Sequence, residues 1–268
     1  MLRKLETHFP GKIETRYVMG GLVENARTFG DSVNGIGGPD MHAFNRQVAA
    51  HWADASRRHG MPVDADNYEL FDDENRSTYP INIAYKAAQI ADPDKADLFL
   101  YNLRAASAAE ARKTNREDVL VSVASESRLD IAAFLKALHD GSAQEAFDAD
   151  LEYTRAMGVQ GFPTFLVQAG DKKYMLRGYN SFDTFATVIE SATGGDIRPV
   201  AVEASPEALL AFMQNGHPRM TAEEIRQAFD LDTAEDARKL AQSNKWSASW
   251  RLSGKRIPFM GSHRWTLR

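Results

Sequence analysis

Few side chains of this sequence could do chemistry, and their spacing indicates no catalytic or metal site. Cysteine is absent, so the chain has no disulfide, no thiol nucleophile and no thiolate ligand. The histidines include neither an i, i+4 pair nor an HExxH motif. The glycines of residues 35–38 lack the GxGxxG spacing of a phosphate loop, and the acidic stretch 64–75 lacks EF-hand spacing. We expect solvated loops there, and no metal or cofactor.

One short motif stands apart, the GVQGFPTF of residues 158–165. Pro163 precedes an apolar run, residues 164–167, that is typical of a buried strand. Proline cannot donate a hydrogen bond to a sheet ladder, so it belongs at the first residue of a strand or at an edge. Arg177 and Tyr179 could line a groove beside this proline, although packing at the edge of the core is an equal alternative.

Periodicity and capping residues predict the elements that position this motif. After a helical N-terminus, alternation predicts a strand over 12–19, and a glycine-rich loop fills residues 20–40. Period-two patterns predict a hairpin of strands 164–168 and 173–177, followed by a helix over 182–192 capped by Ser181. Between them we expect helices over 41–59, from 77 or 78 onward, and over 94–109, 116–125, 131–139 and 142–157. The order indicates an α/β sheet with a helical insertion, about residues 41–157.

Composition is ordinary for a soluble globular protein, with 268 residues, 43% hydrophobic and 26% charged. We expect a cytoplasmic protein without a membrane partner, because no long apolar run or signal-peptide core occurs. The charge is uneven. The last 32 residues hold eight Lys or Arg and no acid, so they carry a net charge of +8. Since the whole chain has a net charge of −5, the first 236 residues carry −13. This asymmetry indicates two modules with different partners.

The C-terminal residues 203–268 follow a linker at 194–202 and resemble a winged helix-turn-helix. Caps at Ser205, Thr221 and Thr233 predict helices over 206–215, 222–229 and 234–243, and residues 247–252 and 262–267 are expected to pair as a wing. In one interpretation the module binds nucleic acid through basic side chains. In the other, which we favour, it docks protein or covers the sheet. The nucleic-acid candidates are Arg238, Lys239, Lys245, Arg251, Lys255 and Arg256.

Residues 1–193 resemble the DsbA family of thiol–disulfide oxidoreductases, a thioredoxin-like fold with an inserted helical domain. GVQGFPTFLV is similar to the family's loop before its third strand, where a cis proline faces the active site. STYPINIAYKAAQ, REDVLVSVASESRLDIAAFLKAL and FDADLEYTRAMGVQGFPTF resemble the insertion helices of its cytoplasmic branch, and LRGYNSFDTF resembles its last strand and helix. SpxH-type adaptors are related. The resemblance implies a cis Phe162–Pro163 bond and a groove in which Phe162, Pro163 and Thr164 bind a protein or peptide substrate.

The sequence departs from the family at its start. The family begins with an interior strand that leads into a Cys-x-x-Cys motif, whereas this sequence opens inside the following helix. We expect that an N-terminal part of the domain is missing, or alternatively that a cysteine-free relative fills the slot in another way. A serine-based variant, the glutathione-using chromene-carboxylate isomerases, also stays open because its serine would lie in that segment.

Two functions therefore compete. The resemblance implies a thiol–disulfide oxidoreductase, but one that is redox-inactive without a cysteine, because attack on a disulfide needs a thiolate. The alternative is a non-catalytic adaptor that binds a partner protein through the same groove, or a nucleic-acid-binding protein through the C-terminal module.

Overall fold

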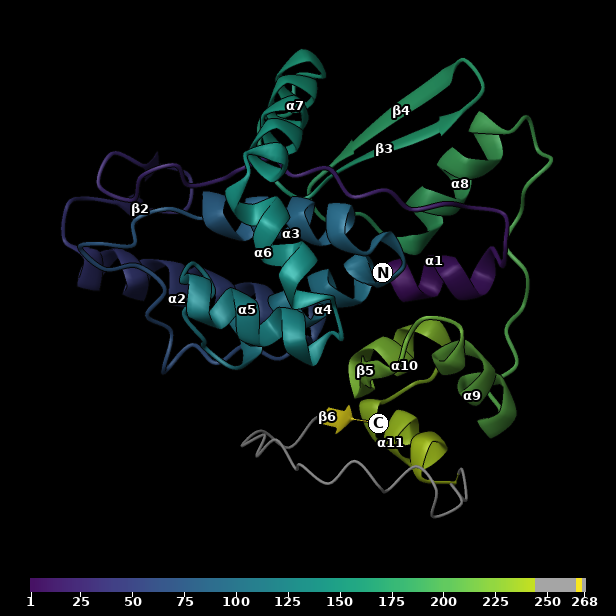
Figure 1. The fold of residues 1–268 in the computed structure, drawn as a ribbon. Helices are drawn as coiled ribbons and strands as arrows, with labels where there is room; N and C mark the ends of the chain where they lie inside the picture. Colours follow the sequence, from purple (N-terminus) through teal and green to yellow (C-terminus); the bar gives the residue numbers. More distant parts are fainter. Residues whose placement is uncertain (244–263, 267–268) are drawn as a thin grey trace. The chain divides into compact units, whose positions relative to one another are not determined.

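A computed structural model describes residues 1–243 and 264–266, and its contacts divide the chain into two compact units (Figure 1). The first, here called the helical unit, is Tyr17–Gly158. The second, here called the sheet unit, combines Met1–Arg16 with the chain from Val159 onward. No helix in these described ranges is long and apolar enough to cross a membrane.

Helices dominate the helical unit, as the apolar periodicity predicts. α2 (Met41–His59) begins at Asp40, whose side chain accepts hydrogen bonds from two backbone N–H groups of the first turn. Gly60 ends it with φ +69°, a left-handed conformation that suits glycine. The other elements are α3 (Tyr79–Ala91), α4 (Pro93–Ala109), α5 (Glu117–Glu126), α6 (Ile131–His139), α7 (Ser142–Ala156) and a short hairpin of β1 (Gly30–Asp31) with β2 (Ile36–Gly37).

A buried ion pair lies in the helical unit next to its larger apolar core. The core joins α3, α4, α5 and α6, and includes Phe99 and Phe134 with ring centroids 5.6 Å apart. Lys86 on α3 and Asp150 on α7 are both buried, and Nζ lies 2.8 Å from Oδ2. The same carboxylate oxygen accepts the backbone N–H of Met19 at 2.8 Å. The two charges are thus paired and hydrogen-bonded, which is the condition for tolerating buried charge.

The sheet unit is built on a hairpin packed against two helices. β3 (Thr164–Ala169) pairs antiparallel with β4 (Lys172–Arg177) in a two-stranded sheet. One face of the hairpin carries Phe165, Val167 and Leu176, which pack against α1 (Leu2–His8) and α8 (Phe182–Ala192). The rings of Phe165 and Phe185 meet edge to face, with centroids 4.9 Å apart. The predicted hairpin and final helix are confirmed, and Ser181 caps α8 through its bond from the backbone N–H of Thr184.

Residues 12–19 form no strand, so the prediction from their alternating pattern is wrong. A strand exists through the ladder that it forms with a neighbour. Within the described part of the chain, β3 and β4 pair only with each other, so residues 12–19 have no ladder to join. Ile13 nevertheless packs against the core of the sheet unit, which accounts for the apolar signal at that position.

The C-terminal residues form the three predicted helices, α9 (Pro206–Gln214), α10 (Ala222–Ala228) and α11 (Ala234–Ser243). Thr221 and Glu224 form the predicted capping box at the start of α10. The predicted pairing of residues 247–252 with 262–267 falls largely outside the described residues. Within them, β6 (Arg264–Thr266) pairs with β5 (Arg219–Thr221), a strand that the sequence did not indicate. β5 is three residues long and has too few positions for an alternating pattern to show.

Candidate functional site

The GVQGFPTF motif forms a tight, exposed loop at the open end of the β3–β4 hairpin, here called the proline loop (residues 161–164). The Phe162–Pro163 peptide bond is cis, as predicted. The backbone N–H of Gly178 donates to the carbonyl of Pro163 at 2.8 Å, and the hydroxyl of Thr164 donates to the carbonyl of Gly161 at 2.7 Å. These two bonds fix the loop on the end of the sheet.

Two aromatic side chains project beside this loop into solvent. Phe162 is 49% exposed and Tyr179 is 78% exposed. Phe162 precedes the cis proline and Tyr179 follows Gly178, so both lie just beyond the open end of the hairpin, and we call them the aromatic pair. The exposure of Tyr179 excludes the alternative that it packs at the edge of the core. Large aromatic groups left in solvent are typical of protein-binding surfaces.

The proline loop offers recognition groups and no reactive ones. The side chains of Phe162 and Pro163 are apolar, and the hydroxyl of Thr164 is engaged with the loop backbone. A hydroxyl becomes a nucleophile when a base withdraws its proton, and here it donates to a peptide carbonyl. Nor do the described residues bring together three His, Asp or Glu side chains that could hold a metal ion.

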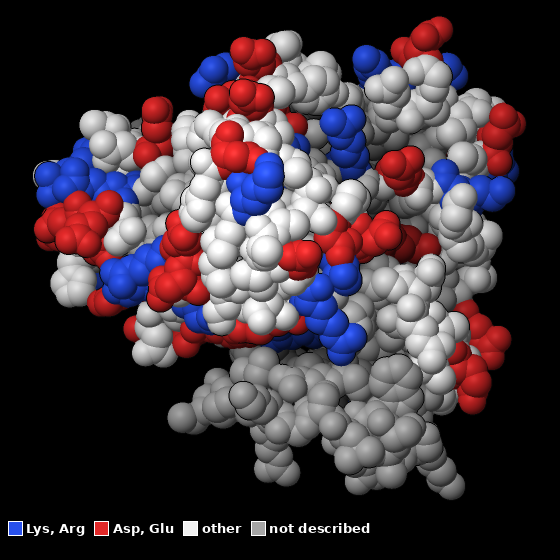
Figure 2. Space-filling view, in the orientation of Figure 1, with Lys and Arg blue, Asp and Glu red and all other residues white. Residues whose placement is uncertain are grey.

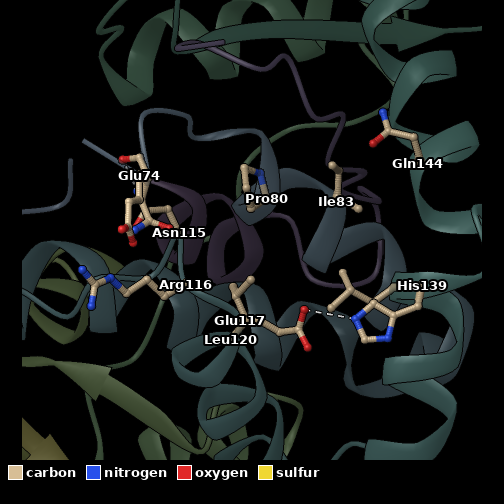
Figure 3. Close-up of a pocket in the computed structure, with 11 residues that line it drawn as sticks. Glu74, Pro80, Ile83, Asn115, Arg116, Glu117, Leu120, His139 and Gln144 are labelled. Carbon is tan, nitrogen blue, oxygen red and sulfur yellow. Dashed lines mark hydrogen bonds and ion pairs between the residues drawn. The ribbon is translucent and has the colours of Figure 1, made fainter. Parts of the chain in front are cut away.

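A separate pocket of about 580 Å³, which no motif of the sequence indicated, opens in the helical unit (Figure 3). Pro80, Ile83 and Leu120 contribute apolar lining, and at the rim the Oε2 of Glu117 accepts a hydrogen bond from His139 Nε2 at 3.0 Å. Arg116, another lining residue, pairs with Asp72, and this hydrogen bond holds the pKa of the Asp72 carboxyl well below its usual range. The lining combines an apolar floor with polar and charged groups, and no arrangement of nucleophile and base stands out among them.

Among the described residues, the basic candidates of the C-terminal module do not form a positively charged surface. The guanidinium of Arg238 is 2.8 Å from Glu235, and the ammonium of Lys239 is 3.7 Å from Asp236, so acids of the same helix neutralise both. Lys245, Arg251, Lys255 and Arg256 lie outside the described residues. On the described surface seen in Figure 2, Lys and Arg are interspersed with Asp and Glu rather than gathered into a basic field.

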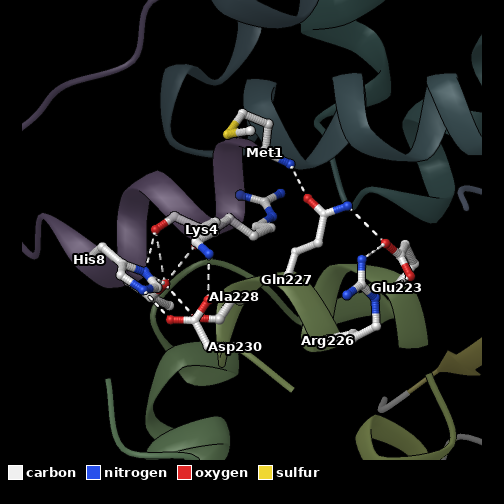
Figure 4. A network of polar contacts seen from close by, with 10 residues as sticks. Met1, Lys4, His8, Glu223, Arg226, Gln227, Ala228 and Asp230 are labelled. Atoms are coloured by element: carbon white, nitrogen blue, oxygen red, sulfur yellow. Dashed lines mark hydrogen bonds and ion pairs between the residues drawn. The ribbon is translucent and has the colours of Figure 1, made fainter. Parts of the chain in front are cut away.

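Polar contacts join α1 to the C-terminal helices, and sequence reasoning missed them (Figure 4). The carboxylate of Asp230 pairs with the ammonium of Lys4 and accepts a hydrogen bond from His8, whose Nε2 lies 2.7 Å from Oδ2 of Asp230. The hydroxyl of Thr7 donates to the carbonyl of Ala228 at 2.7 Å. Burial acts to raise the pKa of Asp230, but the hydrogen bonds from Lys4 and His8 outweigh it and hold the pKa below its ordinary value. These pairs, more than 200 residues apart in sequence, show no local periodicity that could reveal them.

We expect Asp230→Asn to reduce stability in a pH-dependent way. A lowered pKa means that the ionised carboxylate stabilises the folded state above its unfolded pKa, about 3.9, and that this contribution disappears as the pH falls through the folded value. The variant should therefore unfold at lower urea concentration than the native chain at pH 7, and the difference should shrink as the pH falls below about 3.9. Asp196→Asn, at an exposed position of the same unit, is the control and should change nothing. A gap that widened toward acid pH would contradict the assignment.

Comparison with known proteins agrees with this geometry. A family model described as Thioredoxin matches residues 1–187. The chain is 25% identical over 244 residues to the ClpXP adapter protein SpxH of Halalkalibacterium halodurans, covering 90% of this chain and 75% of that protein. It is 31% identical over 168 residues to the protein of the same name from Shouchella clausii, a match that covers 60% of this chain and 53% of that protein.

Solved structures show the same fold. The cytosolic disulfide reductase DsbM from Pseudomonas aeruginosa superposes with a TM-score of 0.50 at 20% identity, over 65% of this chain and 80% of that one. The thioredoxin-like α/β class and the resemblance to DsbA-like and SpxH-type proteins are thereby confirmed. With the family model covering well over half of its length, this chain belongs to the thioredoxin family.

Proposed function

We propose that this protein is a non-catalytic adaptor that binds a partner protein at its proline loop. One observation carries the proposal: a chain similar over 90% of its length to an adapter protein contains no cysteine. Thiol–disulfide exchange requires a thiolate that attacks a disulfide, so the oxidoreductase interpretation lacks its reacting atom in this chain. The adaptor interpretation requires only a surface, and the proline loop provides one.

The binding surface in this proposal is the aromatic pair together with Pro163 and Thr164. Phe162 and Tyr179 each present a large apolar area to solvent, and burying such side chains at an interface contributes strongly to affinity. The backbone carbonyl and N–H of Phe162, for which the described residues show no partner, would supply directional hydrogen bonds. Because the relatives are named ClpXP adapters, we infer the same kind of task here, in which the bound partner is a protein presented to that protease.

The organisation of the chain forms part of the proposal. We propose a DsbA-like domain over 1–193, a linker at 194–202 and a winged-helix-like module over 203–268, part of which lies outside the described residues. Three short helices and the β5–β6 pair support it. We assign this module to protein docking, because the described candidates for nucleic-acid contact are neutralised by neighbouring acids. A cytoplasmic location, as favoured by the sequence, completes the proposal.

Photo-crosslinking tests where the partner binds. The photoreactive residue p-benzoylphenylalanine replaces Tyr179 in one variant and Tyr153 in a control, since Tyr153 is a 46% exposed tyrosine of the helical unit. After irradiation in cells, we expect the Tyr179 variant to capture a defined protein that the Tyr153 variant does not capture. The captured protein must then bind the purified native chain in solution. Equal capture at both positions, or no binding by the purified pair, would refute the proposed surface.

The absence of thiol chemistry is tested separately. In an insulin-reduction assay with dithiothreitol, we expect the purified chain to match the blank, because its sulfur atoms are all methionine thioethers. A cysteine-containing thioredoxin assayed in parallel confirms that the assay responds. Acceleration by this chain that follows its concentration across preparations would contradict a non-catalytic role.

A further inference from the structure

The pocket of the helical unit holds two buried polar atoms that no described residue satisfies. Asn115 lines the pocket and is only 5% exposed. Its Nδ2 donates to the carbonyl of Asn75 at 3.1 Å, but its Oδ1 is buried and has no hydrogen-bond partner among the described residues. Nε of Arg116, another lining residue, is likewise buried without a partner. A buried polar atom left unpaired costs free energy, so these atoms indicate a bound group that pairs with them.

A carboxylate without a partner lies beside Asn115. The carbonyl that Asn115 bonds belongs to Asn75, so the preceding residue, Glu74, lies at the same end of the pocket (Figure 3). The side chain of Glu74 is exposed, and the described residues provide no partner for it. The Oδ1 of Asn115 and the Glu74 carboxylate are both hydrogen-bond acceptors. A cationic donor such as an ammonium group satisfies both.

The surrounding charges also favour a cation. Arg116 is hydrogen-bonded to Asp72, and that bond, with the nearby charges of Asp118 and Glu74, raises the pKa of Arg116. Glu117 also lines the pocket, so four carboxylates stand against one guanidinium and one histidine. The local charge is therefore negative, which attracts a cationic ligand. The unpaired Nε of Arg116 is a donor, and it requires a neutral oxygen acceptor on the same ligand.

The floor of the pocket is apolar. Pro80, Ile83, Leu120 and Leu138 line it, and the volume of about 580 Å³ is within the range of ligand sites. A ligand that fits this lining carries an ammonium group, a neighbouring neutral oxygen and an apolar body. The first residue of a polypeptide combines these three features in its free α-ammonium group, its carbonyl and its side chain.

We propose that this pocket binds the free amino terminus of a polypeptide whose first residue is large and apolar. The ammonium group pairs with Glu74 and Asn115, the first carbonyl accepts a hydrogen bond from Arg116, and the side chain lies on the apolar floor. The inference goes beyond the proposed function, because the pocket lies in the helical unit and the aromatic pair in the sheet unit. The crosslinking experiment at Tyr179 remains the separate test of the adaptor role.

Three peptides of related sequence test the inference by titration into the full chain. The probe is Phe-Ala-Ser-Gly-Ser-amide. The first control is the same peptide with an acetylated amino terminus, which removes the ammonium group. The second is Ala-Phe-Ser-Gly-Ser-amide, which keeps the ammonium group and the composition but moves the aromatic side chain to the second position. We expect each control to bind about tenfold or more weakly than the probe. Equal binding by either control would overturn the inference.

Two smaller probes test the role of the carbonyl. L-phenylalaninamide keeps the ammonium group, the carbonyl and the ring, whereas 2-phenylethylamine lacks the carbonyl. We expect the second compound to bind about tenfold more weakly, because it leaves the Nε donor of Arg116 unpaired. Equal binding of the two compounds would assign the pocket to simple amines and refute recognition of a polypeptide terminus.

Methyl NMR of the full chain locates the bound peptide. During titration with the probe, we expect the methyl resonances of Ile83, Leu120 and Leu138 to shift, because these side chains line the pocket. The methyl resonances of Ile189, which is buried in α8 of the sheet unit, should not shift. Shifts confined to other residues, or no shifts at all, would refute the site.

Glu74→Gln tests the ammonium contact. Its side chain is exposed, so the variant should keep the native urea midpoint. We expect it to weaken binding of the free-terminus peptide about tenfold and to leave binding of the acetylated peptide unchanged. Glu152→Gln, which changes an exposed acid of α7 outside the pocket lining, is the matched control and should alter neither. Native affinity of the Glu74→Gln variant for the free-terminus peptide would contradict the proposed contact.

Discussion

Phe162→Ala combined with Tyr179→Ala is expected to weaken partner binding about 30-fold or more, with little change in stability. Both side chains are exposed in the free protein, so the folded state depends little on them. An aromatic side chain buried at an interface contributes about 1 kcal/mol or more when truncated, so the two together contribute about 2 kcal/mol or more, and about 1.4 kcal/mol corresponds to tenfold in affinity. Titration of the captured partner by calorimetry, beside urea unfolding of the same variants, measures both quantities.

Tyr153→Ala is the matched control for this effect. It removes a tyrosine of similar exposure from the helical unit, and it should leave partner binding within about twofold. If the aromatic double variant bound the partner with native affinity, the proline loop would not be the docking surface. A drop in both binding and stability would instead show that these side chains support the fold.

The largest expected effect on stability comes from the buried ion pair of the helical unit. Asp150→Ala leaves the Lys86 ammonium buried without its carboxylate and removes the acceptor of the Met19 N–H. Breaking such a pair by removing one partner destabilises a protein by about 3–5 kcal/mol. We therefore expect a large fall in the urea midpoint of the helical unit, which circular dichroism would measure.

The comparison variant for that effect is Lys136→Met, which removes the ammonium from an exposed pair with Asp140. Surface pairs contribute about 0–1 kcal/mol, so this change should be close to neutral. A double variant, Lys86→Met with Asp150→Leu, should recover much of the loss by replacing buried charge with apolar groups. Equal midpoints for Asp150→Ala and Lys136→Met would show that the buried pair contributes no more than a surface pair.

Local signals in the sequence were sufficient for the helices. Caps such as Asp40, Ser181 and Thr221 act on N–H groups two or three residues away, so a short stretch of sequence reveals them. The cis Phe162–Pro163 bond has a different basis, because it was implied by the resemblance of the motif and its flanks to the DsbA family.

Features that depend on distant partners could not be predicted. The pattern of residues 12–19 has strand character, but a strand also needs a neighbour, and the described chain gives it none. Lys86 and Asp150 are 64 residues apart, and His8 and Asp230 are 222 apart, so neither pair repeats at a helical or strand period. The exposure of Tyr179 was equally undetermined, because the same residue type serves a core edge or a binding surface.

Degradation of the captured partner by purified ClpXP tests the adaptor role most directly. The partner is incubated with the protease alone, with the native chain, or with the Phe162→Ala and Tyr179→Ala double variant. The adaptor account predicts that the native chain speeds loss of the partner, that the double variant does so far less, and that the chain itself is not consumed. A partner degraded at the same rate with and without the native chain, although it binds that chain, would contradict the account.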